Sequence, residues 1–357
     1  MADEGELQAL LPRASEKNMN PVIQTSKNHS IETLRAAAVV LVFMNHLHSL
    51  NILTIPYFGI SGGWIGVQIF FVISGYLIIQ SALRYSAADY FKHRALRIYP
   101  AYLFWFFLFS LVFQHLQWNN IDVKSLLIHL VFLQHFFPAA YEKYNALSVS
   151  WTLTIEMVWY VVAFFIAARF AKSPTKITAI FVALACFWVY GGMRWHPLIN
   201  KLEGIYIYFF IQNSAFSQLP FFLFGAWIAV KQPKYDKAAL LSIFVTTIVL
   251  YKAWEPVFMT PIFITGLGIS ALFLLLKDTE YENPKFVKRL SDISYSFYLV
   301  HYPILVLSAH VVQNKYQRTL LAFVVTVAVS YVSYKLIEQP FMNMAKKRTK
   351  DAGPSAG

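Results

Sequence analysis

Three ionisable side chains interrupt long apolar stretches of this sequence and are the first candidates for chemistry. Arg35 and His46 lie in the apolar segment 31–50, and Glu156 lies in the apolar segment 151–170. Ionisable residues are costly inside a membrane, and they usually face the bundle interior or a wet cavity where they serve a function. An arginine can hold an anion, an imidazole can exchange a proton near neutral pH, and a carboxylate can orient an imidazole.

The spacing of these residues predicts which of them meet. Eleven residues of helix separate Arg35 from His46, which places them on one face and about 16 Å apart along the axis. Counted from the outer ends of their helices, His46 and Glu156 lie at similar depths, about 6 and 8 Å. We therefore predict that Glu156 pairs with His46 and fixes its tautomer. The alternatives are a snorkelling Arg35, a His46 bonded to another helix as a core residue, and a Glu156 paired with an arginine.

A basic stretch, DYFKHRALRIYPAY, occupies residues 89–102. Arg94 and Arg97 are three residues apart and would share one helix face, and guanidinium forks match the geometry of phosphate oxygens. The stretch therefore predicts a clamp for a phosphate-rich cytosolic ligand such as coenzyme A. Anchoring of a cytoplasmic loop by positive charge is the alternative.

Composition indicates the elements that must position these residues. Of 357 residues, 57% are hydrophobic and 13% are charged, whereas soluble domains are roughly 25% charged. We predict an all-α integral membrane protein, a bundle of about ten transmembrane helices, with a short interfacial or re-entrant segment near 125–137. The ten predicted spans are 31–50, 61–82, 98–117, 151–170, 177–193, 211–230, 238–253, 257–276, 293–312 and 319–337.

Charge predicts the sidedness of this bundle. With ten spans and a cytoplasmic N-terminus, most of the 30 Lys and Arg residues fall on the cytoplasmic side, as the positive-inside rule requires. We expect a multi-pass protein with both termini in the cytoplasm. The net charge of +12 then reflects topology and attraction to anionic lipid, and nucleic acid is not an expected partner. A polar tail (1–28) and a basic tail (344–357) flank the transmembrane domain (29–343).

Several stretches, taken together and in order, resemble the membrane-bound acyltransferase-3 family. They are Arg35-x10-His46, GVQIFFVISGYLI, KHRALRIYP, WTLTIEMVWY, SDISYSFYLVHYPI and KLIEQPF. The resemblance covers residues 29–343 and implies a ten-span bundle. It also implies transfer of an acyl group, usually acetyl, from cytosolic acyl-CoA to a hydroxyl of a polysaccharide, a lipid-linked glycan or another glycosylated acceptor. Some members add an extracytoplasmic hydrolase-like domain; only a short tail follows the last span here, so we expect the single-domain branch.

The resemblance also implies roles for the residues found above. Arg94 and Arg97 would hold the phosphates of acetyl-CoA, and Arg35 would line the inner path of its thioester arm. His46 would be essential, as a general base or a transient acyl carrier, with Glu156 orienting it. We thus expect an acyl-CoA-dependent O-acetyltransferase of the bacterial inner membrane.

Two further expectations complete the interpretation. Tyr298 and His301, with Trp151, are expected to line the same cavity. No metal is expected, because the histidines do not have the spacing of a closed site and no acidic cluster joins them. A transporter or flippase that uses Arg35, His46 and Glu156 as a proton relay is the alternative function.

Overall fold

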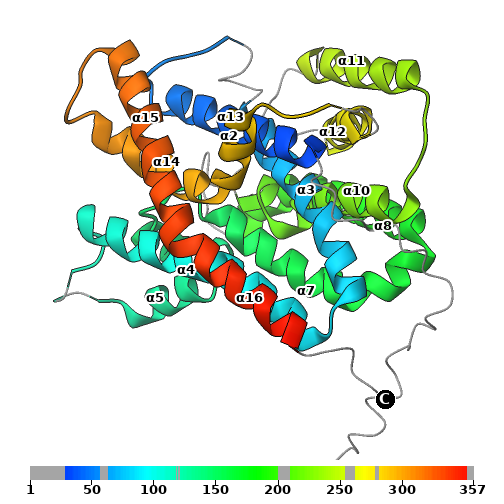
Figure 1. Ribbon diagram of the computed structural model, residues 1–357, viewed down its shortest axis with the longest axis horizontal. Coiled ribbons are helices and arrows are strands. Elements are labelled where there is room, and N and C mark those ends of the chain that lie inside the picture. The colour runs from blue at the N-terminus through cyan, green and yellow to red at the C-terminus, as the bar shows by residue number, and fades with distance from the viewer. Residues whose placement is uncertain are drawn as a thin grey trace, which may run out of the picture.

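The fold is seen in a computed structural model, which describes residues 29–56, 63–117, 119, 121–199, 210–253, 262–277 and 281–351. Within these ranges every regular element is a helix (Figure 1). The elements are α2 (His29–Ser49), α3 (Gly63–Arg84), α4 (Ala87–Val112), α5 (Val123–Leu130), η2 (Gln134–Phe136), α6 (Pro138–Lys143), α7 (Trp151–Lys172), α8 (Pro174–Ile199), α10 (Ala215–Lys231), α11 (Lys237–Ala253), α12 (Ile262–Lys277), α13 (Lys285–Asp292), α14 (Ser294–Ser308), α15 (Lys315–Ser333), η3 (Tyr334–Glu338) and α16 (Gln339–Asp351). The predicted tail 1–28 lies outside the described residues.

Six helices of the described chain are long and apolar enough to cross a membrane. They are α2, α3, α4, α7, α8 and the continuous helix Lys315–Ala345. The helices α10, α11 and α12 are apolar but shorter, and α14 has 15 residues with Pro303 inside it. Within the described residues, each of the ten predicted segments overlaps one of these helices, so the integral membrane, all-helical class is confirmed. The count of ten spans stays a prediction.

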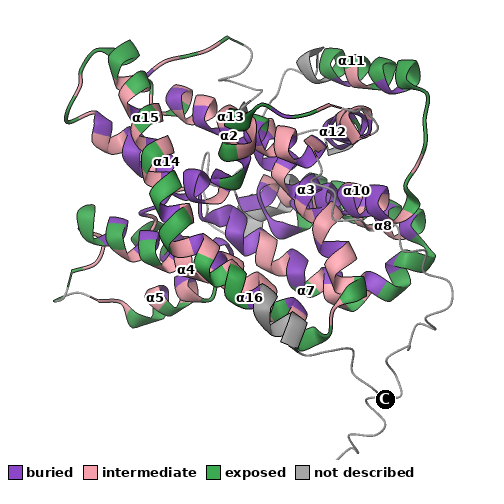
Figure 2. Ribbon diagram, in the orientation of Figure 1, coloured by how far each residue is buried: buried purple, intermediate pink, exposed green. Residues whose placement is uncertain are grey.

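The membrane-facing side of the bundle is apolar, as lipid contact requires. Figure 2 shows buried residues gathered at the centre and exposed residues along peripheral helices such as α11 and α15. Leu241, Val245 and Val249 of α11 and Leu320 and Val324 of α15 are exposed and hydrophobic. Such apolar surface is unusual on a water-soluble monomer, and it suits helices whose outer faces contact acyl chains.

The basic stretch forms helix rather than a loop. Helix α4 begins at Ala87, where the Ser86 hydroxyl accepts the backbone N–H of Asp89 at 3.2 Å, and it passes Pro100 before it ends at Val112. The predicted start of this span at residue 98 was therefore too late. Arg94 and Arg97 consequently project from a rigid helix that belongs to the bundle.

The segment predicted to be interfacial or re-entrant contains no helix long enough to cross a bilayer. Its longest helix, α5, has 8 residues. His129 is buried there, its Nε2 lies 2.9 Å from the carbonyl of Ala140, and its own carbonyl accepts the hydroxyl of Tyr102 at 3.0 Å. Burial lowers the pKa of His129 to about 4, so this ring stays neutral at physiological pH. The hydrogen bond from Tyr102 to the backbone carbonyl of His129 holds the segment against α4.

A π-helical turn joins α15 to α16. It spans Tyr334–Glu338, and the N–H of Gln339 reaches back to the carbonyl of Tyr334. The side chain of Glu338 is buried and accepts hydrogen bonds from the hydroxyl and the backbone N–H of Ser296 in α14. The turn thus fastens the start of α14 to the last helix. The helix continues to Asp351, past the predicted end of the span at residue 337.

Helices α3 and α10 cross backbone against backbone. A Cβ atom on Gly75 would lie 1.8 Å from the carbonyl oxygen of Phe222, and one on Gly225 would lie 1.8 Å from that of Val72. Small residues allow membrane helices to approach in this way. Next to the crossing, Phe71 stacks on Phe222 with 4.5 Å between ring centroids. The crossing therefore sets where α3 presents its side chains to the interior.

We expect Gly75→Val to destabilise the protein by about 3 kcal/mol or more, because the added carbons meet a carbonyl that cannot move aside without shifting α10. The measurement is the thermal unfolding midpoint in detergent, together with the fraction that remains monodisperse. Gly192→Ala is the matched control, since its Cβ would meet only the side chain of Ile211, at 3.0 Å. Equal midpoints for the two variants would contradict the close crossing.

Candidate active site

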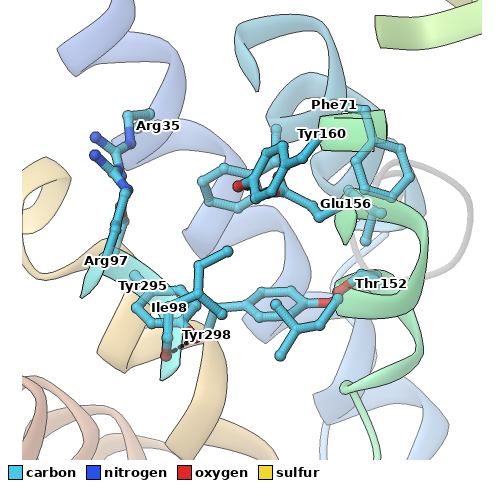
Figure 3. Close-up of a pocket in the computed structure, with 13 residues that line it drawn as sticks. Arg35, Phe71, Arg97, Ile98, Thr152, Glu156, Tyr160, Tyr295 and Tyr298 are labelled. Carbon is cyan, nitrogen blue, oxygen red and sulfur yellow. Dashed lines mark hydrogen bonds between the residues drawn. The ribbon is translucent and has the colours of Figure 1, made fainter. Parts of the chain in front are cut away.

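Five helices enclose a cavity in the middle of the bundle. The space holds about 590 Å³, counting its open mouth, and is lined from α2, α3, α4, α7 and α14 (Figure 3). Its polar lining includes Arg35 of α2, Arg97 of α4, Thr152, Glu156 and Tyr160 of α7, and Tyr298 of α14, while α3 supplies apolar side chains such as Phe71. Four of the residues singled out in the sequence therefore share one cavity: Arg35, Arg97, Glu156 and Tyr298.

Two arginines converge on this cavity. The guanidinium groups of Arg35 and Arg97 point toward one another in Figure 3, although they come from different helices. Carboxylates act on both groups through charge: Glu338, Asp292 and Glu156 on Arg35, and Glu156 and Glu338 on Arg97. Two like charges in a membrane interior repel each other and are costly to desolvate. The arrangement therefore suits an anionic ligand that would lie between them.

Arg94 lies apart from that pair. Its Nη2 donates to the hydroxyl of Ser81 in α3 at 3.4 Å, and Arg94 is not among the residues that line the cavity. Inside the cavity Arg97 is accompanied by Arg35, and the phosphate clamp of Arg94 with Arg97 stays a prediction.

Glu156 has partners other than the predicted one. It accepts a short hydrogen bond from the hydroxyl of Tyr160, one turn further along α7, and a second from the hydroxyl of Ser74. The charges of Arg94 and Arg97 also act on it. Glu156 therefore bonds two hydroxyl groups, and the arginines act on it through charge.

His46 is paired with another histidine. Its Nδ1 lies 2.9 Å from Nε2 of His301, and the two ring centroids are 4.9 Å apart. The ring of Tyr302 packs edge-on against His46 at 5.2 Å. The predicted partnership of His46 with Glu156 is thus corrected. Equal depth in the membrane did not bring the two together, because the direction in which each side chain leaves its helix also decides its neighbours.

Tyr298 connects the cavity to this histidine pair. Its hydroxyl accepts a hydrogen bond from Thr152 at 3.0 Å, and its ring centroid lies 5.8 Å from that of His301. His301 itself is fully buried behind the lining. Trp151 does not line the cavity; its ring packs on His135 at 5.7 Å. Of the three residues expected to line the cavity, the structure therefore places Tyr298 there and the other two outside it.

Two residues of this region were missed in the sequence. Tyr160 follows Glu156 by four residues, the spacing at which helix side chains meet, so its signal was present. Glu338 holds Ser296 and acts electrostatically on both Arg35 and Tyr295. Its sequence signal was its place in KLIEQPF, one of the stretches that carry the family resemblance.

Within the described ranges, no three His, Cys, Asp or Glu side chains come close enough to hold a metal ion. The chemistry that the arrangement does offer is an anion site made by two arginines and, beyond Tyr298, a pair of imidazoles. These are the elements of acid–base chemistry on a substrate that carries negative charge.

Comparisons with known proteins find relatives named as a transacylase and as O-acetyltransferases. BcsY of Komagataeibacter xylinus is 26% identical over 347 residues, covering 90% of this chain and 84% of BcsY. An O-acetyl transferase of Shigella phage Sf6 is 25% identical, covering 90% of this chain and 98% of that protein. Peptidoglycan O-acetyltransferase OatA of Listeria monocytogenes is 24% identical, covering 87% of this chain and 55% of OatA. No solved structure gives a significant match.

A family model described as an acyltransferase domain matches residues 28–335. This match takes in the arginines, Glu156 and both histidines, and it agrees with the family expected from the sequence. The chain therefore belongs to the membrane-bound acyltransferase-3 family.

Proposed function

We propose that this protein is an O-acetyltransferase that takes the acetyl group from acetyl-CoA and transfers it to a hydroxyl of a polysaccharide, a lipid-linked glycan or another glycosylated acceptor. The observation that carries the proposal is the convergence of Arg35 and Arg97 on a cavity whose Tyr298 wall contacts His301 of the histidine pair. Such a cavity offers an anion site, and the proposed base lies beyond its Tyr298 wall.

The donor would bind with its phosphates on the arginine side. Arg35 and Arg97 hold phosphate oxygens, and Arg94, three residues earlier in α4, extends the basic surface outside the cavity. Glu156 keeps Tyr160 in place and partly offsets the arginine charges. The neutral thioester arm then reaches along the aromatic lining toward Tyr298.

The transfer itself would use His46 as general base. The acceptor hydroxyl gives its proton to His46 while its oxygen attacks the thioester carbon. The carbon–sulfur bond breaks, and the departing thiolate of coenzyme A takes the proton back from His46. Atoms and charge balance without a metal or a redox partner. A transient acyl group on His46 is the alternative sequence of steps.

The test is to incubate the purified protein with acetyl-CoA and measure free thiol release in the presence of candidate glycan acceptors. The proposal requires thiol release that depends on the acceptor, with acetyl recovered as an ester on it. A transporter or flippase would leave acetyl-CoA intact and acceptors unmodified. An acetyl group trapped on the protein before acceptor is added would favour the alternative mechanism, in which His46 carries the acyl group transiently.

We propose further that the protein lies in a bacterial inner membrane with both termini in the cytoplasm, so that the donor arrives from the cytosol. Ala88 and Glu142 are both exposed, on opposite sides of the proposed topology. In a Cys186→Ser background, we expect a membrane-impermeant thiol reagent to label Glu142→Cys in intact cells. Ala88→Cys should react only after permeabilisation. The opposite labelling pattern would reverse the topology.

A further inference from the structure

Both ring nitrogens of His301 have partners inside the protein. Its Nδ1 lies 2.8 Å from the carbonyl oxygen of Tyr298 and 3.1 Å from that of Phe297, and its Nε2 lies 2.9 Å from Nδ1 of His46. The residue has no exposed surface. No carboxylate of the described chain bonds this ring, so burial favours its neutral form.

These contacts determine where the protons are. A carbonyl oxygen can only accept, so Nδ1 of His301 must carry the ring proton. A neutral imidazole has one such proton, which leaves Nε2 of His301 as an acceptor. Nδ1 of His46 must then donate to it, and Nε2 of His46 is left with the lone pair that a base needs.

We infer that His301 is a positioning residue that locks His46 in the tautomer with a basic Nε2. This inference rests on the proposed function of His46 as a general base. In serine proteases an aspartate sets the tautomer of the catalytic histidine and also stabilises its cation by charge. Here the neutral ring of His301 sets the tautomer of His46. Two backbone carbonyls of α14 in turn set the tautomer of His301.

The position of α14 makes the lock rigid. Ser296 is held by Glu338, and Tyr298 is held by Thr152. These contacts fix the helix turn whose carbonyls orient His301. Because the lock acts through geometry rather than charge, its loss should lower the turnover of bound substrates without changing how tightly acetyl-CoA binds.

The first test measures the tautomer directly, without activity. In protein labelled with ¹⁵N-histidine, the ring nitrogen shifts of His46, assigned from a His46→Gln spectrum, should report a protonated Nδ1. In His301→Phe, which keeps a ring but removes the acceptor, the His46 signals should move toward the other tautomer. A wild-type His46 protonated at Nε2 would overturn the inference whatever the enzyme does.

The second test is kinetic. We expect His301→Phe to lower kcat by roughly 10- to 100-fold, part of the range for general base help, with KM for acetyl-CoA unchanged. His301→Gln should recover most of the rate, since its amide oxygen can accept from His46. Ser308→Ala, in the same helix, is the control for packing. A Gln variant as impaired as the Phe variant, with the same tautomer as wild type, would mean that His301 is only structural.

The two tests distinguish a failure of the proposed function from a failure of the positioning role of His301. Wild-type protein that releases no thiol from acetyl-CoA would count against the proposed function, while the nitrogen shifts would still decide the tautomer. A correct tautomer in an active enzyme, together with an unimpaired His301→Phe variant, would overturn the positioning role alone.

Discussion

Replacing His46 with alanine should lower acetyl transfer by about 10²- to 10⁴-fold, the usual contribution of a general base, and leave acetyl-CoA binding intact. The binding step is expected to survive because the arginines of the cavity, and not His46, face the anion site. Transfer is measured as acetyl ester formed per enzyme, and binding as the Kd for acetyl-CoA on the same preparation.

His48→Ala is the matched control. His48 lies two residues further along α2, and its ring bonds the hydroxyl of Thr54 at 2.9 Å, away from the His46–His301 pair. We expect this variant to transfer acetyl at nearly the wild-type rate. A folded His46→Ala protein with wild-type transfer would refute the mechanism and leave His46 as a packed histidine of the core.

Removing the converging charges should weaken donor binding. Arg35→Ala and Arg97→Ala should each cost about 1.5–3 kcal/mol of acetyl-CoA affinity, the loss expected for a hydrogen bond to a charged group. Arg97→Lys should also be impaired, because an ammonium cannot form the two-pronged contact that a guanidinium makes with phosphate. Equilibrium titration with acetyl-CoA at fixed ionic strength measures these changes.

A control variant separates this effect from net charge. Arg84 is exposed at the end of α3 and packs on the ring of Tyr85, with its guanidinium carbon 5.5 Å from the ring centroid. Arg84→Ala removes one positive charge outside the cavity and should bind acetyl-CoA as the wild type does. An unchanged Kd in the double variant Arg35→Ala, Arg97→Ala would exclude the anion site.

Much of the site could be predicted because charge is rare in apolar segments. Arg35, His46 and Glu156 stood out by residue type alone, and the structure brings two of them to one cavity. Their partners could not be predicted in the same way. Periodicity gives the depth of a residue and the face of its own helix, whereas the rotation and neighbours of that helix depend on packing across the whole bundle.

The ends of helices could likewise be predicted from the sequence only in part. The start of α4 was misplaced because the basic stretch was interpreted as a loop, although Ser86 followed three residues later by Asp89 is a recognised signal for a helix start. The end of α15 gave no such signal. The π-helical turn depends on the burial of Glu338 against another helix, and no local pattern in KLIEQPF specifies it.

That turn has a consequence for the register of the last helix. A π-helical turn holds an extra residue, so α16 starts about 100° out of phase with the regular continuation of α15. Because of this change in phase, the continuous helix Lys315–Ala345 exposes Leu320 and Val324 on its outer face and directs Glu338 inward to Ser296. If the same residues formed a regular α-helix instead, Glu338 would be rotated away from Ser296 of α14. The π-helical turn therefore sets the contact that holds the start of the helix carrying Tyr298 and His301.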